Sequence, residues 1–123
     1  MKAEQLQRLA RLLGGEFKEF EINGPTIYAC EWGNHEERQD PEFVIYADSG
    51  DERPAECFDL LDRLEANGWT CTLDNHVKVY RTSARRQRDP GMTCAISEES
   101  HYANGKTRTS AIVNLFLEVN KDA

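Results

Sequence analysis

The hydrophobic positions at the start of the chain repeat with the period of an α-helix. Leu6, Leu9, Ala10 and Leu13 are spaced i, i+3, i+4 and i+7, which places them on one helical face. A glycine pair follows directly and supplies a stop, because glycine readily adopts the left-handed conformation that ends helices. The pattern predicts an amphipathic helix over residues 2–13.

Two short segments rich in aromatic and branched residues come next. Residues 17–22 and 26–32 flank an Asn-Gly-Pro turn at 23–25, which is typical of an antiparallel hairpin. After a polar stretch, the apolar run at 43–46 indicates a third strand. We therefore expect three strands after the first helix.

A second helix is expected to begin near Pro54 and to end at Gly68. Proline fits the first turn of a helix, and acidic residues on both sides of it suit the positive end of the helix dipole. We expect Phe58, Leu61 and Leu64 to face inward.

A second hairpin and another third strand are expected after this helix. Residues 69–73 and 77–80 alternate apolar and polar positions, and Asp74-Asn75 supplies residues suited to a turn. A polar loop over 82–91 then leads to alternating apolar positions at 92–97, which predict the strand.

The chain closes with a third helix. Residues 97–107 are rich in Ser, Asn and Gly and predict a loop, and the helix follows over about 108–120. Its apolar face carries Ile112, Leu115, Phe116 and Val119.

The order of these elements, α-βββ-α-βββ-α, predicts an α+β fold with antiparallel sheets. The connections of two to five residues are too short for parallel crossovers. Both halves carry Asp-Pro before the third strand, at 40–41 and 89–90. An internal duplication, with pseudo-repeats at about 1–50 and 51–105, accounts for this order. Two coincidentally similar units within a single domain, residues 1–123, account for it as well.

Composition narrows the class of protein. Of 123 residues, 39% are hydrophobic and 30% are charged, and charges interrupt every apolar run, which excludes a membrane-spanning helix. The four cysteines, Cys30, Cys57, Cys71 and Cys94, are far apart among apolar neighbours, so we expect reduced core thiols and a cytoplasmic protein. The sequence predicts no metal and no cofactor, since its one close Cys/His pair lacks the spacing of zinc ligands.

The net charge of −7 is unevenly distributed. Residues 1–77 carry 7 basic and 17 acidic side chains, whereas 78–123 carry 8 basic and 5 acidic ones. Such a split favours two different kinds of partner, one basic and one anionic.

The basic part suggests an anion-binding site. Arginines grip phosphate with two hydrogen bonds, and the start of a helix offers free N–H groups to anions. A solvated loop that offsets the acidic remainder is the alternative interpretation. The candidate anion-binding residues are Arg85, Arg86, Arg88, Lys106 and Arg108.

The acidic part suggests a protein-binding surface that imitates a nucleic-acid backbone. Carboxylates cluster near two aromatic residues that we expect to be exposed, although a merely solubilising surface has the same composition. The candidate partner-binding residues are Tyr28, Glu31, Trp32, Glu36, Glu37 and Asp40.

No catalytic arrangement is evident from the sequence. His35, His76 and His101 lie in three separate polar segments, and none has the sequence context of a known nucleophile motif. We therefore expect a protein that is not an enzyme.

Two family resemblances concern the second half of the chain. From about 55 to 119, a third strand at 92–97, Thr107 and Thr109 before the last helix and Ala111-Ile112 within it resemble the phage ABA sandwich domain. That resemblance implies a phage or prophage origin and no assigned reaction. The same αβββα order with Gly105-Lys-Thr resembles a double-stranded RNA-binding domain, but Thr109-Ser110-Ala111 stands where that family has lysines.

These observations lead to two functional hypotheses. The first is a phage or mobile-element accessory protein, present in the host cytoplasm, that binds a host protein with a basic surface. It would act as an inhibitor of a nucleic-acid-handling defence complex, as an anti-CRISPR protein does. The alternative is a nucleic-acid or nucleotide-binding module that uses the arginine-rich segment 81–88 with Lys106 and Arg108. The sequence leaves the oligomeric state open.

Overall fold

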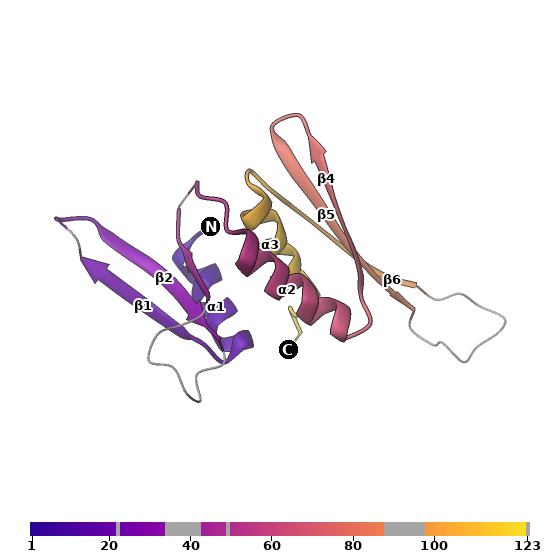
Figure 1. Cartoon of the computed structure of the whole chain (residues 1–123), viewed down its shortest axis with the longest axis horizontal. Helices are drawn as coiled ribbons and strands as arrows, with labels where there is room; N and C mark the ends of the chain where they lie inside the picture. The colour runs from indigo at the N-terminus through magenta and orange to yellow at the C-terminus, as the bar shows by residue number, and fades with distance from the viewer. Residues whose placement is uncertain (22, 34–42, 49, 88–97, 123) are drawn as a thin grey trace.

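The computed structural model places three helices between two antiparallel three-stranded sheets (Figure 1). It describes residues 1–21, 23–33, 43–48, 50–87 and 98–122. The expected α+β fold with the order α-βββ-α-βββ-α is confirmed. The elements are α1 (Ala3–Leu13), β1 (Glu16–Glu21), β2 (Thr26–Trp32), β3 (Phe43–Tyr46), α2 (Pro54–Ala66), β4 (Thr70–His76), β5 (Val79–Gln87), β6 (Glu98–Gly105) and α3 (Arg108–Val119).

Sheet A has the strand order β1-β2-β3, so β2 is its central strand. Cys30 pairs with Phe17 on one side and with Ile45 on the other, and alternation along β2 places Trp32 on the same face. Helix α1 covers this face with Leu6 and with Leu9, and it ends as expected at the left-handed Gly14. The buried face of sheet A is therefore built from large apolar side chains.

Sheet B has the strand order β4-β5-β6, with β5 in the centre. Cys71, Ala84 and His101 lie opposite one another across its helix-facing side, and Thr82 pairs with Ala103 two residues along. These are mostly small side chains, and α3 packs against β5 and β6 on this side. The other face carries hydroxyl, amide and charged side chains.

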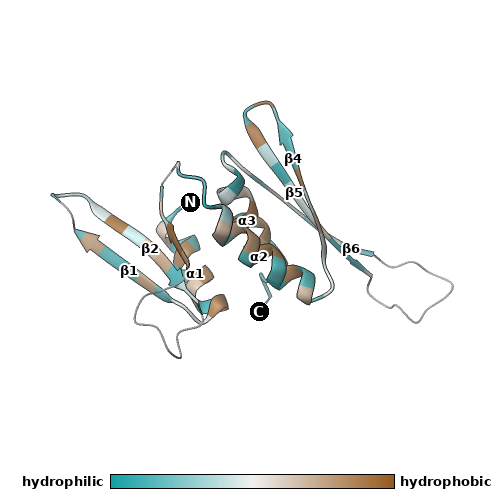
Figure 2. Ribbon diagram, in the orientation of Figure 1, coloured by the Kyte–Doolittle hydropathy of each residue, from teal (hydrophilic) through white to brown (hydrophobic). Residues whose placement is uncertain are grey.

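Helix α3 lies in the middle of the molecule. Its buried residues include Ala111, Val113, Leu115 and Leu117, which point in different directions around the helix axis. A helix that is apolar around most of its circumference must be covered on several sides, and Figure 2 shows brown apolar segments on the helices. One cluster of buried residues joins all three helices to both sheets.

The structure corrects three details of the second half. The turn expected at Asp74-Asn75 lies instead at residues 77–78, where Lys78 has a φ of 66°. Strand β5 continues through most of the segment expected to be a loop at 82–91, and β6 occupies the segment expected to be a loop at 97–107. The strand expected at 92–97 lies outside the described residues. The helix-facing residues of these strands are mostly small or polar. They therefore do not produce the alternating hydrophobic pattern that predicts a strand.

The buried face of α2 is rotated by about one residue from the expected one. Phe58 is 66% exposed, whereas Cys57, Leu60 and Leu64 are buried. Glu56 is buried as well, and its carboxylate accepts the main-chain N–H of Val44 in β3. None of the described helices has the length and apolar character needed to cross a membrane.

Candidate interaction surfaces

The hairpin of β1 and β2, called the acidic hairpin below, carries most of the acidic surface of sheet A. It contains four glutamates and one lysine. Glu16, Glu19 and Glu21 are exposed, and the hairpin extends beyond α1 (Figure 1). On its outer face Phe20, which is 37% exposed, pairs with Ile27. The hairpin thus presents an accessible aromatic side chain on its outer face and the carboxylates of Glu19 and Glu21 on its other face.

The two described candidate residues Tyr28 and Glu31 both lie on this hairpin, but each has a partner. The Tyr28 ring stacks on Phe17 with 5.7 Å between centroids, and the carboxylate of Glu19 raises the pKa of Tyr28. Glu31 accepts from the Lys18 Nζ at 2.7 Å, and this contact raises the pKa of Lys18. Glu16 also lies 3.8 Å from this lysine, so Lys18 offsets the charge of Glu16 and Glu31 rather than that of Glu19 and Glu21.

Trp32 is not exposed, contrary to the expectation from sequence. Its side chain is fully buried, stacks on Phe43 at 5.6 Å, and donates its indole N–H to Asp59 Oδ2 at 2.6 Å. The strand alternation explains this position, since Trp32 shares the helix-facing side with Cys30. Trp32 therefore belongs to the core. The candidate residues Glu36, Glu37 and Asp40 lie outside the described residues.

The candidate anion-binding arginines of β5 lie on opposite faces of sheet B. Arg85 is exposed on the outer face. Arg86 points to the helix side, where its guanidinium lies 4.3 Å from the centroid of Trp69 and donates to Glu99 Oε2 at 3.2 Å. Adjacent residues of a strand cannot share one ligand on one face. Arg88 lies outside the described residues.

Lys106 and Arg108 lie at the far end of the β5-β6 ladder. Arg86 pairs with Glu99 at one end and Tyr80 pairs with Gly105 at the other, which corresponds to a separation of roughly 20 Å. The Arg108 guanidinium stands over the Tyr80 ring, 5.4 Å from its centroid. The structure therefore separates the anion-binding candidates into at least two places.

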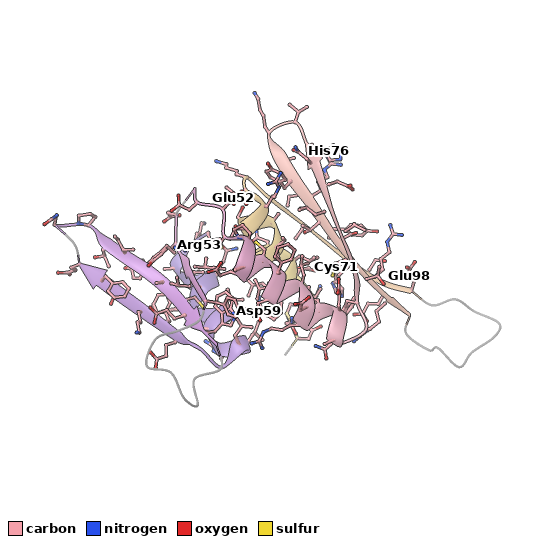
Figure 3. All side chains as sticks on the ribbon, viewed as in Figure 1. Glu52, Arg53, Asp59, Cys71, His76 and Glu98 are labelled. Carbon is pink, nitrogen blue, oxygen red and sulfur yellow. The ribbon has the colours of Figure 1, made fainter. Side chains whose placement is uncertain are left out.

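The N-terminus of α3 already binds a carboxylate of the chain itself. The main-chain N–H of Arg108 donates to Glu52 Oε1 at 2.9 Å, and the main-chain N–H of Ser110 donates to the Thr107 hydroxyl at 3.0 Å. Figure 3 shows Glu52 in the segment before α2, beside the start of α3. Glu52 thus fills the position that the sequence suggested for an external anion.

A cluster that the sequence did not reveal joins β5, β6, α3 and Trp69, the residue before β4. His101 Nε2 lies 3.0 Å from Glu99 Oε1, its Nδ1 lies 3.6 Å from Glu118 Oε1, and its ring meets Trp69 edge-on. A cavity of about 580 Å³ adjoins this cluster and is lined by Trp69, Arg86 and Glu99 among others. Strand register brings these residues together, so no local sequence pattern marked them.

The two described histidines lie on different strands of sheet B. His76 is exposed at the end of β4, His101 lies on the edge strand β6, and His35 falls outside the described residues. Among the residues the structure describes, no three His, Cys, Asp or Glu side chains are grouped so as to hold a metal ion. Burial raises the pKa of Cys30 to about 12, which keeps this thiol protonated and unreactive.

Comparisons with known proteins give no match to this chain. Neither the protein-family models, nor the curated proteins, nor the solved structures contain one. A functional argument therefore starts from the surfaces described above.

Proposed function

We propose that this chain is a non-enzymatic binding protein that docks the acidic hairpin onto a basic surface of a host protein. The main support is the accessible Phe20, which pairs with the partly buried Ile27 on the outer face of the hairpin, together with the exposed carboxylates of Glu19 and Glu21 on its other face. Aromatic side chains supply much of the affinity in protein interfaces, and nearby charges set orientation and association rate.

The proposal includes a biological setting. A row of carboxylates on a projecting hairpin can occupy a groove that otherwise binds nucleic-acid phosphates. The resemblance of residues 55–119 to the phage ABA sandwich domain supports a phage or mobile-element origin. The chain would then inhibit a nucleic-acid-handling defence complex in the host cytoplasm, in the manner of an anti-CRISPR protein.

A capture experiment with matched charge reversals tests this function. The immobilised full-length chain should retain a specific protein from bacterial host lysate at low salt and release it at high salt, because contacts between exposed charges are screened. Glu19→Lys with Glu21→Lys should abolish retention. Asp62→Lys with Glu65→Lys on α2 makes the same change in net charge at other exposed positions, and should preserve it.

The outcome that contradicts the proposal is equally specific. Equal loss with both pairs of substitutions would show that net charge alone governs retention. Retention that survives the hairpin substitutions would place the contact elsewhere on the molecule.

One observation favours nucleic-acid binding as a second candidate function. Arg81 and Arg85 are exposed on the outer face of sheet B, and Tyr102, which is 65% exposed, lies on the same face. An aromatic ring beside arginines suits stacking and phosphate contacts with single-stranded nucleic acid.

The anisotropy of a labelled single-stranded oligonucleotide at low salt should rise with the wild-type chain and not with Arg81→Ala/Arg85→Ala. Arg11→Ala/Arg63→Ala is the control of equal charge. No rise with the wild-type chain would rule this candidate out.

A further inference from the structure

Among the strands that the structure describes, three of the four outer edges of the two sheets carry a feature that opposes pairing with another chain. Such features are common because an open edge presents free main-chain donors and acceptors. Glu56 accepts the main-chain N–H of Val44 in β3, and the Asn114 side chain donates to the carbonyl of Asn104 in β6 at 2.8 Å. The edge strand β1 carries the glutamates Glu16, Glu19 and Glu21.

The edge formed by β4 differs from the other three. Its residues are exposed except for the partly buried Cys71, and Asp74 is its single acidic residue. Within the described parts of the chain, no hydrogen bond from outside sheet B reaches the main chain of Thr70–His76. At about 3.4 Å per residue this open edge is roughly 24 Å long. Figure 3 labels Cys71 and His76 near its two ends.

The hairpin geometry fixes which main-chain groups are free. A two-residue turn at 77–78 makes His76 and Val79 a hydrogen-bonded pair, and such pairs recur at every second residue. Asp74 and Thr72 therefore bond to β5. The N–H and C=O groups that point outward belong to Cys71, Leu73 and Asn75.

We infer that β4 pairs with β4 of a second copy of this chain, in antiparallel register about a two-fold axis at Leu73. The three outward-facing residues are spaced evenly about Leu73, so Cys71 meets Asn75 of the other copy and every outward donor finds an acceptor. This register forms about six main-chain hydrogen bonds. It also joins the two copies of sheet B into one continuous sheet.

The side chains of β4 suit this self-pairing. Leu73, which is 39% exposed, lies opposite its own symmetry mate and is covered by it. Asp74 lies opposite Thr72, so the two carboxylates do not face each other. The same pairing through β1 would bring several glutamates together, which favours β4 as the contact between copies. This inference concerns sheet B and does not rest on the proposed function of the acidic hairpin.

Sedimentation velocity on the full-length chain, over about 1–300 µM, tests the inference. We expect a dimer whose fraction rises with concentration, since a single strand pair buries less surface than a standard interface. Asn75→Pro removes one outward N–H and is compatible with an edge strand, so it should weaken dimerisation at least tenfold. Asn75→Ala removes the side chain but keeps the N–H, and should leave the dimer unchanged.

A cross-link tests the register. Two Cα atoms in a hydrogen-bonded antiparallel pair lie about 5.5 Å apart, within the range of a disulfide. Leu73→Cys should therefore give an oxidised dimer joined at position 73, mapped by mass spectrometry, whereas Thr72→Cys should give little.

Defined outcomes would overturn the inference. These are a monomer at every concentration, or a dimer that Asn75→Pro leaves intact and that does not cross-link at position 73. Circular dichroism establishes that each variant is folded. If Asn75→Pro does not fold, Leu73→Lys replaces it, because it sets two ammonium groups against each other at the axis and should also give a monomer.

Discussion

The two sheets contact the helix layer in different ways. Sheet A fills the space with large side chains, among which Trp32 and Ile45 are almost fully buried. Sheet B presents Thr82, Ala84 and Gly105, so the main chain of α3 lies close to the sheet. Thr82 Oγ1 even reaches the carbonyl of Ala111 in α3 at 3.3 Å.

The same order of helices and strands is therefore packed in two opposite ways. Sheet A packs against the helices through large side chains. Sheet B packs through small side chains, which let an apolar helix approach its main chain. A shared order in the two halves therefore does not imply equivalent side chains at equivalent positions. The same contrast extends outward, since sheet A presents an acidic hairpin and sheet B an open strand edge.

The largest change in the free energy of unfolding is expected when a large side chain is removed from sheet A. Trp32→Ala should lower the free energy of unfolding by about 3–5 kcal/mol, because it leaves a cavity and removes the hydrogen bond to Asp59. Phe58→Ala, at a mainly exposed position on α2, should cost much less. Urea denaturation followed by circular dichroism measures both. Equal losses of unfolding free energy in the two variants would mean that packing around Trp32 does not contribute substantially to the stability of the fold.

The next largest change in stability is expected when a side chain is added at a close contact in sheet B. A Cβ at Gly105 would lie 2.8 Å from the Cα of Ala111 and closer still to its main-chain nitrogen. Gly105→Ala should therefore destabilise the fold by about 1–3 kcal/mol. Gly50→Ala, where nothing lies within 4 Å, is the matched control in the same denaturation experiment. A neutral result at Gly105 would contradict the close approach of α3.

A smaller effect is expected at the N-terminus of α3. Glu52→Ala removes a carboxylate from the positive end of this helix and should cost about 0.5–1 kcal/mol. Glu65→Ala, which removes an exposed carboxylate near the C-terminal end of α2, should cost nothing or stabilise slightly. If thermal unfolding shows no difference between these variants, Glu52 does not act as a cap.

Hydropathy predicted sheet A and the helices better than sheet B. The apolar residues of β2 and β3 and the spacing of Leu6 and Leu9 mark a buried face directly. The small inner residues of β5 and β6, such as Ala84 and Ala103, leave no such mark, so the sequence pattern predicts a loop over part of β5 and over the whole of β6. Their structure depends on contact with α3, which is distant in sequence.

The candidate surfaces were predicted only in part. Sequence identified the acidic character of β1 and β2 and the exposure of Arg85, because both depend on composition. It placed Trp32 on the surface because carboxylates surround it in sequence, whereas strand alternation points it into the core. The contacts of Arg86 with Glu99 and of Glu52 with Arg108 depend on register and on helix packing, which no local pattern encodes.

The smallest expected effect concerns pH and lies where α3 meets sheet B. The Lys121 ammonium, 3.1 Å from Glu118, and secondarily His101 hold the pKa of Glu118 below its usual value of 4.5. A carboxyl whose pKa is lowered on folding stabilises the fold when ionised. The difference in unfolding free energy between wild type and Glu118→Gln should therefore be present at neutral pH and shrink as the pH falls through the lowered pKa. Urea denaturation from pH 7 to about pH 3 measures this difference. A difference that stays constant over that range would mean that Glu118 contributes to stability through its shape rather than through its charge.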